Sequence, residues 1–188
     1  LYQKIQRAVE ERNVLFVRNV LETVPGINLK RCCLESSNWT LLHISVKLGD
    51  EAMLQLLLST KQLNINAQEI THKYTPLHIA VLENRSKIVY MLLSHGCDWD
   101  IFDGFQRTPL YCACACGFTE VVAEILKFKI TIDLADRTGR TPLQVASFHG
   151  FTAIVKLLVS RGANVNIRDQ SNHTALFLAA AGDEDDDN

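Results

Sequence analysis

The chain has 188 residues, of which 47% are hydrophobic and 21% are charged, and its formal net charge is −2. This composition is ordinary for a globular chain. No run of 18 apolar residues occurs and no charged segment leads into an apolar one, so we expect neither a membrane span nor a signal peptide. Without the five acidic residues of 183–187 the chain has 19 basic and 16 acidic residues, which is too small an excess to indicate nucleic-acid binding.

The N-terminal segment, positions 1–26, is predicted to form a helix pair that recurs later in the chain. Residues 8–21 align without a gap with residues 80–93, and both segments carry apolar residues at helical spacing. The polar residues of this first pair suit an end unit whose outer side faces water. The link over residues 26–38 is longer than the later links, so we expect a longer first loop.

One six-residue phrase recurs five times and organises the rest of the chain. Each copy begins with a threonine, and these threonines stand at positions 40, 75, 108, 141 and 174. A nearly fixed period of about 33 residues indicates stacked structural units. The copies are Thr40-Leu-Leu-His-Ile-Ser45, Thr75-Pro-Leu-His-Ile-Ala80, Thr108-Pro-Leu-Tyr-Cys-Ala113, Thr141-Pro-Leu-Gln-Val-Ala146 and Thr174-Ala-Leu-Phe-Leu-Ala179.

Each phrase is predicted to begin a helix. Its threonine can accept a hydrogen bond from an N–H group of the first turn, and the proline that follows in three copies needs no N–H there. A second helix is predicted in later units from apolar residues at helical spacing in segments 88–93, 121–126 and 154–159. Gly96 and Gly162 are predicted to end two of these helices.

The phrase Thr75-Pro-Leu-His-Ile-Ala80 resembles the signature of the ankyrin repeat, T-P-L-H-x-A. The resemblance implies an all-α repeat solenoid, which is an ankyrin-repeat stack of antiparallel helix pairs joined by β-hairpin-like finger loops. It implies a single domain over residues 1–182. The repeats are expected at about 1–26, 38–66, 73–100, 106–133 and 139–166, with a partial repeat at 172–182.

The resemblance also assigns roles to single residues of the loops. The histidine of the phrase, present as His43 and His78, is expected to bond loop backbone. The turn of each finger needs a residue that tolerates positive φ, as Gly139 and Asn172 do. Gln106 does not tolerate it readily, so we expect a distorted turn there.

The C-terminal end is predicted to lack a second helix in its last unit. After Gly182 the chain continues as Asp183-Glu-Asp-Asp-Asp-Asn188. Residues 183–188 are either a disordered acidic tail or a helix–helix loop of a chain that was cut before its second helix. We favour the cut, because Leu1 is not an initiating methionine and both ends resemble the boundaries of a fragment.

No combination of residues indicates an enzyme, a cofactor or a metal site. The sequence contains neither G-x-S-x-G nor H-E-x-x-H. Cys112, Cys114 and Cys116 alternate along a predicted helix, where residues two apart point about 200° apart and cannot converge on one metal ion. We therefore expect reduced, space-filling cysteines.

The resemblance implies that a concave surface of finger loops and first helices binds a partner protein. Several of the residues carried over to that surface are tryptophan, tyrosine and arginine, which are the types enriched in interface hot spots. An alternative for the aromatic residues is that they fold back onto the next loop. The expected partner-binding residues are Trp39, Leu48, Tyr74, Leu82, Phe105, Arg107, Arg137, Arg140, Phe148, His149 and His173.

The sequence favours a scaffold or adaptor module that binds another protein. The bound segment of that partner is expected to carry acidic groups between apolar anchors. The partner segment is an extended peptide or the edge of a folded domain, and the chain itself is expected to be monomeric and without nucleic-acid or membrane contacts. Two alternatives stay open, a regulatory ankyrin domain of a larger enzyme or channel, and a regulator similar to the inhibitors of NF-κB-type transcription factors. We expect an intracellular, cytoplasmic location, with the nucleus as an alternative.

Overall fold

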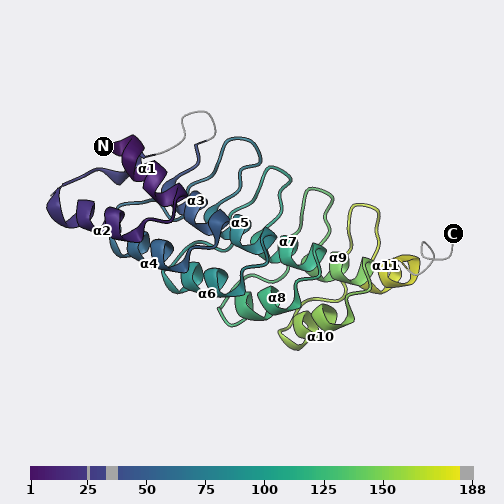
Figure 1. Cartoon of the computed structure of the whole chain (residues 1–188). Helices are drawn as coiled ribbons and strands as arrows, with labels where there is room; N and C mark the ends of the chain where they lie inside the picture. The colour runs from purple at the N-terminus through teal and green to yellow at the C-terminus, as the bar shows by residue number, and fades with distance from the viewer. Residues whose placement is uncertain (25, 33–37, 183–188) are drawn as a thin grey trace. The chain divides into compact units, whose positions relative to one another are not determined.

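The computed structural model describes residues 1–24, 26–32 and 38–182, and the regular structure over these residues consists of helices (Figure 1). Residues 33–37 and 183–188 lie outside the described residues, so the longer first loop and both interpretations of the acidic end stay predictions. The helices are α1 (Tyr2–Glu10), α2 (Val14–Thr23), the 3₁₀ helix η1 (Leu29–Arg31), α3 (Leu41–Leu48), α4 (Glu51–Ser59), α5 (Pro76–Leu82), α6 (Ser86–Ser94), α7 (Pro109–Ala115), α8 (Thr119–Ile125), α9 (Pro142–Phe148), α10 (Thr152–Ser160) and α11 (Ala175–Gly182).

The predicted helix starts are confirmed, and the threonine of the phrase caps them. The Thr75 hydroxyl accepts from the His78 N–H at 3.3 Å, and Thr141 accepts from the Gln144 N–H at the same distance. Pro76, Pro109 and Pro142 each occupy the first position of their helix, where no intrahelical N–H bond is lost. The cap therefore needs only residues that are close in sequence, which is why the phrase predicts it.

The predicted second helices are confirmed as α6, α8 and α10. Gly96 and Gly162 stand two positions after the last residues of α6 and α10 and have φ of 77° and 89°, which other residues rarely adopt. The N-terminal helix pair is also confirmed, as α1 and α2, and Asn13 caps α2 by accepting from the Phe16 N–H at 3.0 Å.

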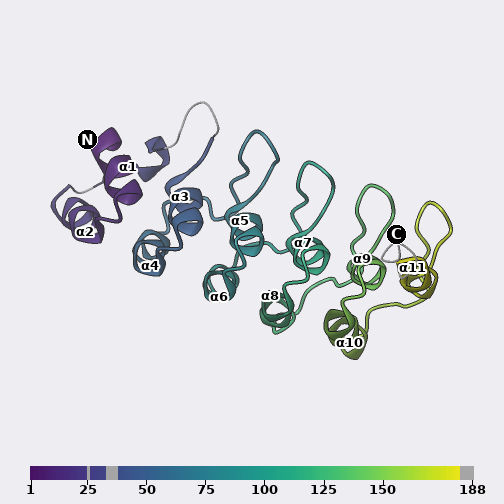
Figure 2. The same cartoon turned by 45° about the vertical axis from the view of Figure 1, so that its right-hand side comes forward.

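The described chain divides into two compact units, 1–97 and 98–188. In unit 1, α3 contacts both α1 and α5, and these inner helices carry α2, α4 and α6 as their outer partners (Figure 1). In unit 2, α9 contacts α7 and α11, while the outer helices α8 and α10 contact each other (Figure 2). The single domain expected over residues 1–182 stays a prediction.

Small residues allow the inner helices to approach one another. The last residue of the phrase is fully buried as Ala80 in unit 1 and as Ala113 and Ala146 in unit 2. The leucine of the phrase is buried beside it at Leu110 and Leu143, so each inner helix presents apolar atoms to its neighbours. Close packing of this kind leaves no room for a larger side chain.

The loops of unit 2 make regular turns, including the one that was expected to be distorted. Gln106 adopts φ of 59°, and its N–H donates to the carbonyl of Asp103 at 3.0 Å. Gly139 makes the same bond to Asp136, also at 3.0 Å. The prediction of a distorted turn at Gln106 is therefore wrong, because side-chain hydrogen bonds of the same loop hold its backbone in this conformation.

Over the described residues, no helix is long and apolar enough to cross a membrane.

Replacing Ala146 by leucine should destabilise the chain by about 1–3 kcal/mol, because the extra atoms force neighbouring side chains and backbone to shift. Thermal unfolding monitored by circular dichroism measures this change. Ala153→Leu is the matched control, since Ala153 lies exposed on α10. Equal unfolding temperatures for the two variants would contradict the packing at Ala146.

Candidate partner-binding surface

The loops of unit 2 are built around one carboxylate each. Asp103 accepts from the N–H groups of Phe105 and Arg107, both at 2.8 Å. Asp136 and Asp169 make the corresponding bonds to the residues two and four positions later, at 2.8 to 3.1 Å. Loop N–H groups that no helix satisfies thus find an acceptor, which fixes the backbone that carries the expected binding residues.

These hydrogen bonds favour the charged form of two of the carboxylates, Asp136 and Asp169. Burial raises the pKa of Asp169, but bonds from the His173 N–H and from Arg140 outweigh this effect and bring its pKa below the usual value. Burial likewise raises the pKa of Asp136, and hydrogen bonds from Thr138 and Tyr111 lower it by more. The loops of Asp136 and Asp169 are therefore held by ionised acceptors at neutral pH.

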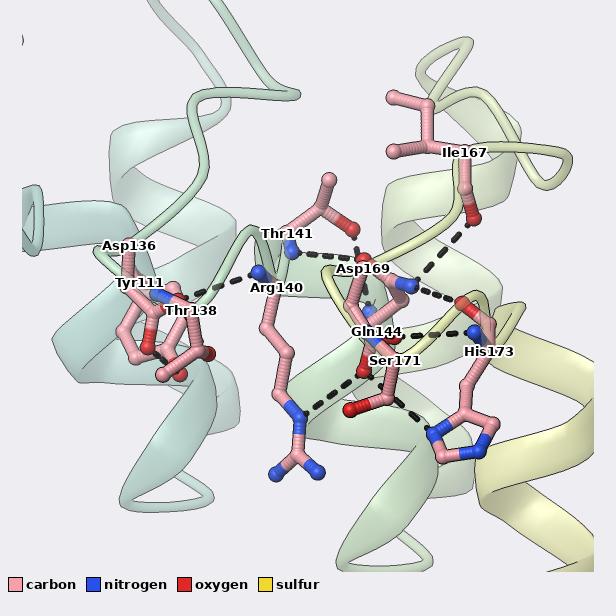
Figure 3. Close-up of polar contacts among 10 residues, drawn as sticks. All are labelled: Tyr111, Asp136, Thr138, Arg140, Thr141, Gln144, Ile167, Asp169, Ser171 and His173. Atoms are coloured by element: carbon pink, nitrogen blue, oxygen red, sulfur yellow. Dashed lines mark hydrogen bonds and ion pairs between the residues drawn. The ribbon is translucent and has the colours of Figure 1, made fainter.

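Side chains at the fourth position of the phrase join each helix pair to the next loop (Figure 3). The Tyr111 hydroxyl donates to Asp136 at 3.0 Å. The Gln144 amide donates to the carbonyls of His173 at 2.7 Å and Ile167 at 3.3 Å. Because of these bonds, the loops that carry Arg140 and His173 are positioned by the helices beneath them.

In unit 1, the histidine at the fourth position of the phrase also bonds the backbone of the next loop, as expected for His43. Its Nδ1 accepts from the Thr40 N–H at 3.1 Å, and its Nε2 lies 3.2 Å from the carbonyl of Tyr74. Since a carbonyl only accepts, Nε2 must carry the proton. Burial lowers the pKa of His43 and keeps the ring neutral. The ring is therefore a structural link between Thr40 and the loop.

Three of the four expected binding residues of unit 1 meet in one pocket. Trp39, Tyr74 and Leu82 line a cavity of about 290 Å³, which we name the Trp39 pocket, while Leu48 does not line it. Lys47 and Glu83 form an ion pair at the same cavity. The Tyr74 ring stacks on His72 with a centroid distance of 5.0 Å. The pocket therefore combines apolar walls with one lysine, Lys47, and two glutamates, Glu69 and Glu83.

The expected residues of unit 2 form a surface on which guanidinium groups lie over aromatic rings. The carbons of the Arg107 and Arg137 guanidinium groups lie 4.8 and 5.0 Å from the centre of the Phe105 ring, which is 41% exposed. Arg140 lies 5.4 Å from the centre of the Phe148 ring. We name these five residues, Phe105, Arg107, Arg137, Arg140 and Phe148, the arginine surface. Phe105 does contact the next loop through Arg137, as the alternative for the aromatic residues allowed.

The three arginines differ in how their charge is balanced. Arg107 pairs with the buried Asp103 at 2.8 Å, and Arg140 approaches Asp169 at 3.4 Å. Arg137 is exposed and forms no ion pair within the described part of the chain. Its backbone carbonyl is held by the Gln170 amide at 2.9 Å. Arg137 thus offers an uncompensated cation from a fixed backbone position.

The two expected histidines lie beside other rings. His173 stacks on Phe177 with a centroid distance of 4.2 Å, and one of its nitrogens lies 3.7 Å from the Asp169 carboxylate. His149 is exposed and meets Phe148 edge to face at 5.2 Å. Both therefore border the residues of unit 2 that carry the candidate surface.

The described cysteines are free thiols in distinct environments. Cys112 and Cys114 are buried, and burial raises the pKa of Cys112 to about 12 and that of Cys114 as well. Cys116, at the end of α7, is exposed. No group of three or more metal-ligating side chains comes together among the described residues.

The loop carboxylates were missed by the sequence interpretation, although the sequence carries a signal for them. Asp103, Asp136 and Asp169 recur with the same period as the phrase, and each stands five residues before its threonine. The period that identified the phrase therefore also identifies the acidic residue that holds each loop.

The comparison with protein families matches residues 5–103 and 97–169 to a family described as ankyrin repeats in three copies. The chain belongs to the ankyrin-repeat family. This confirms the predicted family and the all-α repeat fold. Members of the family generally bind other proteins and are typically not catalytic. No curated protein matches the chain.

The loop carboxylates of this ankyrin-repeat chain should make its stability fall in acid. The folded pKa of Asp169 lies below the unfolded one, so its contribution is complete above the unfolded pKa and is lost as pH falls through the folded pKa. Urea unfolding between about pH 6 and about pH 3 should show a smaller loss of stability for Asp169→Asn than for the wild type.

Asp100→Asn is the control for this experiment, because Asp100 is an exposed aspartate. We expect this variant to lose stability in acid as the wild type does. An unchanged acid dependence in Asp169→Asn would refute the role given to the loop carboxylate.

Proposed function

We propose that this ankyrin-repeat chain is a scaffold or adaptor module that binds a partner protein through the Trp39 pocket and the arginine surface. The observation that carries the proposal is the exposed Phe105 ring, which both the Arg107 and the Arg137 guanidinium groups contact. Aromatic and arginine side chains contribute strongly at interfaces, and those held in place before binding lose little entropy when a partner arrives.

The chemistry of the two surfaces indicates the kind of partner segment. The Trp39 pocket offers apolar walls for an aliphatic or aromatic side chain, beside the Lys47–Glu83 pair. Arg137 offers a cation with no carboxylate of its own in the described chain, so a partner carboxylate would gain a favourable contact there. We therefore propose a partner that offers both acidic groups and apolar anchors, bound by a monomeric chain.

We propose an intracellular, cytoplasmic location, with the nucleus as the alternative. Five free cysteines in the described residues support this, because thiols persist in reducing compartments.

Selection of peptides from a random library on the immobilised chain tests the function and the partner chemistry together. We expect selected peptides to contain acidic residues and at least one large apolar residue. A selected peptide should bind Arg137→Glu at least tenfold more weakly than the wild type, a difference of about 1.4 kcal/mol. Lys156→Glu makes the same change of charge at an exposed position of α10 and should leave binding within about twofold.

The Trp39 pocket is tested with Trp39→Ala against Tyr90→Ala, an exposed tyrosine on α6. Loss of the pocket wall should weaken an apolar anchor by about 2 kcal/mol, whereas the control should bind normally. Circular dichroism confirms that each variant is folded. Equal binding by all four variants would place the interface elsewhere on the chain and refute the proposal.

A further inference from the structure

A cavity of about 250 Å³ lies in unit 1, apart from the Trp39 pocket. It lies where the outer helices α4 and α6 end, and these helices are neighbours in both views of the chain (Figures 1 and 2). One lysine and one histidine line it, and none of its lining residues is acidic. Its other walls are the aliphatic side chains of Leu42, Leu57, Leu58, Leu63 and Ile65.

The internal repeat shows how the equivalent place in unit 2 is filled. His95 and Arg161 stand at the same distance after their phrase threonines, and Leu58 corresponds in the same way to Leu126. In unit 2, the Arg161 guanidinium donates to the carbonyl of Leu126. In unit 1, the Nδ1–H of His95 donates to the carbonyl of Met91 on its own helix, at 2.8 Å. The space that Arg161 crosses in unit 2 therefore stays open in unit 1, with Leu58 and His95 among its walls.

A backbone hydrogen bond decides that the occupant of this cavity need not be a donor. The Lys61 N–H donates to the carbonyl of Leu58 at 3.2 Å. The equivalent carbonyl, that of Leu126, receives the Arg161 guanidinium instead. Because Leu58 already has its donor, the cavity favours an apolar body that fills the space between the aliphatic walls.

The charge at the cavity comes from Lys61. Gly96 and Gly162 hold the corresponding positions after α6 and α10, with φ of 77° and 89°, and Lys61 has φ of 53°. The lysine therefore adds an amine where these two repeats have no side chain. Within the described part of the chain this amine forms no ion pair. A carboxylate in the cavity would gain a charge-assisted hydrogen bond from it.

We propose that this cavity binds a small amphipathic carboxylate, with its apolar chain between the aliphatic walls and its carboxylate on Lys61. An engineered apolar cavity of about 150 Å³ holds benzene, so the larger volume here suits an unbranched chain of about eight carbons. This inference is independent of the proposed function, because the cavity shares no residue with the Trp39 pocket or the arginine surface.

The probe is octanoate, which is titrated into the isotope-labelled full chain and followed by NMR. We expect saturable shifts at the residues that line the cavity. Octylammonium has the same carbon chain and the opposite charge, and it should bind about tenfold more weakly, since it meets Lys61 as a like charge. Acetate has the charge without the long chain and should cause no saturable shift at these residues.

Two variants test the two parts of the site. His95→Arg introduces the residue that crosses the equivalent space in unit 2, and it should weaken octanoate binding about tenfold. Lys61→Gly removes the amine and tolerates the positive φ, so the preference for octanoate over octylammonium should disappear. Lys73→Gly is the matched control, because Lys73 is an exposed lysine with φ of 61° that does not line the cavity. It should bind octanoate as the wild type does, and circular dichroism checks that each variant is folded.

Any one of three results would overturn the proposal. The first is the absence of saturable octanoate shifts at the cavity residues of the wild-type chain. The second is binding of octylammonium as tight as that of octanoate, which would remove the role of Lys61. The third is octanoate binding by folded His95→Arg that equals the wild type, which would place the ligand outside the cavity.

Discussion

The arginine surface of this protein depends on the carboxylates that hold the loops of unit 2. In unit 2 a loop connects one helix pair to the next, and its N–H groups have no helical partner. Asp103, Asp136 and Asp169 each accept two of these N–H groups, and hydrogen bonds to a charged acceptor are stronger than those between neutral groups. The positive φ at Gln106 is maintained by the same bonds. The loop backbone is thus set before any partner arrives.

The three arginines on that backbone differ in their ion-pair partners. Arg107 returns to the carboxylate of its own loop, Arg140 reaches the carboxylate of the next loop, and Arg137 has no carboxylate partner in the described chain. The first two stabilise the fold and orient the aromatic rings beneath them. Only the third contributes a charge that a partner can neutralise without first breaking a bond within the protein. In the proposed function, folding and recognition are therefore carried by different members of one cluster.

The sequence by itself determined the repeat, the helix starts and the helix pairs, because a cap joins atoms only three residues apart and the apolar spacing is equally local. It also supplied the residue types of the candidate binding surface. The tertiary structure decided how they are used. Arg140 meets Asp169 of the following loop, and Phe105 meets Arg137 of the loop after its own. Leu143 and Leu176 occupy the same local position, yet one is buried and the other exposed. Local sequence cannot distinguish them, since burial depends on which helix lies above each residue.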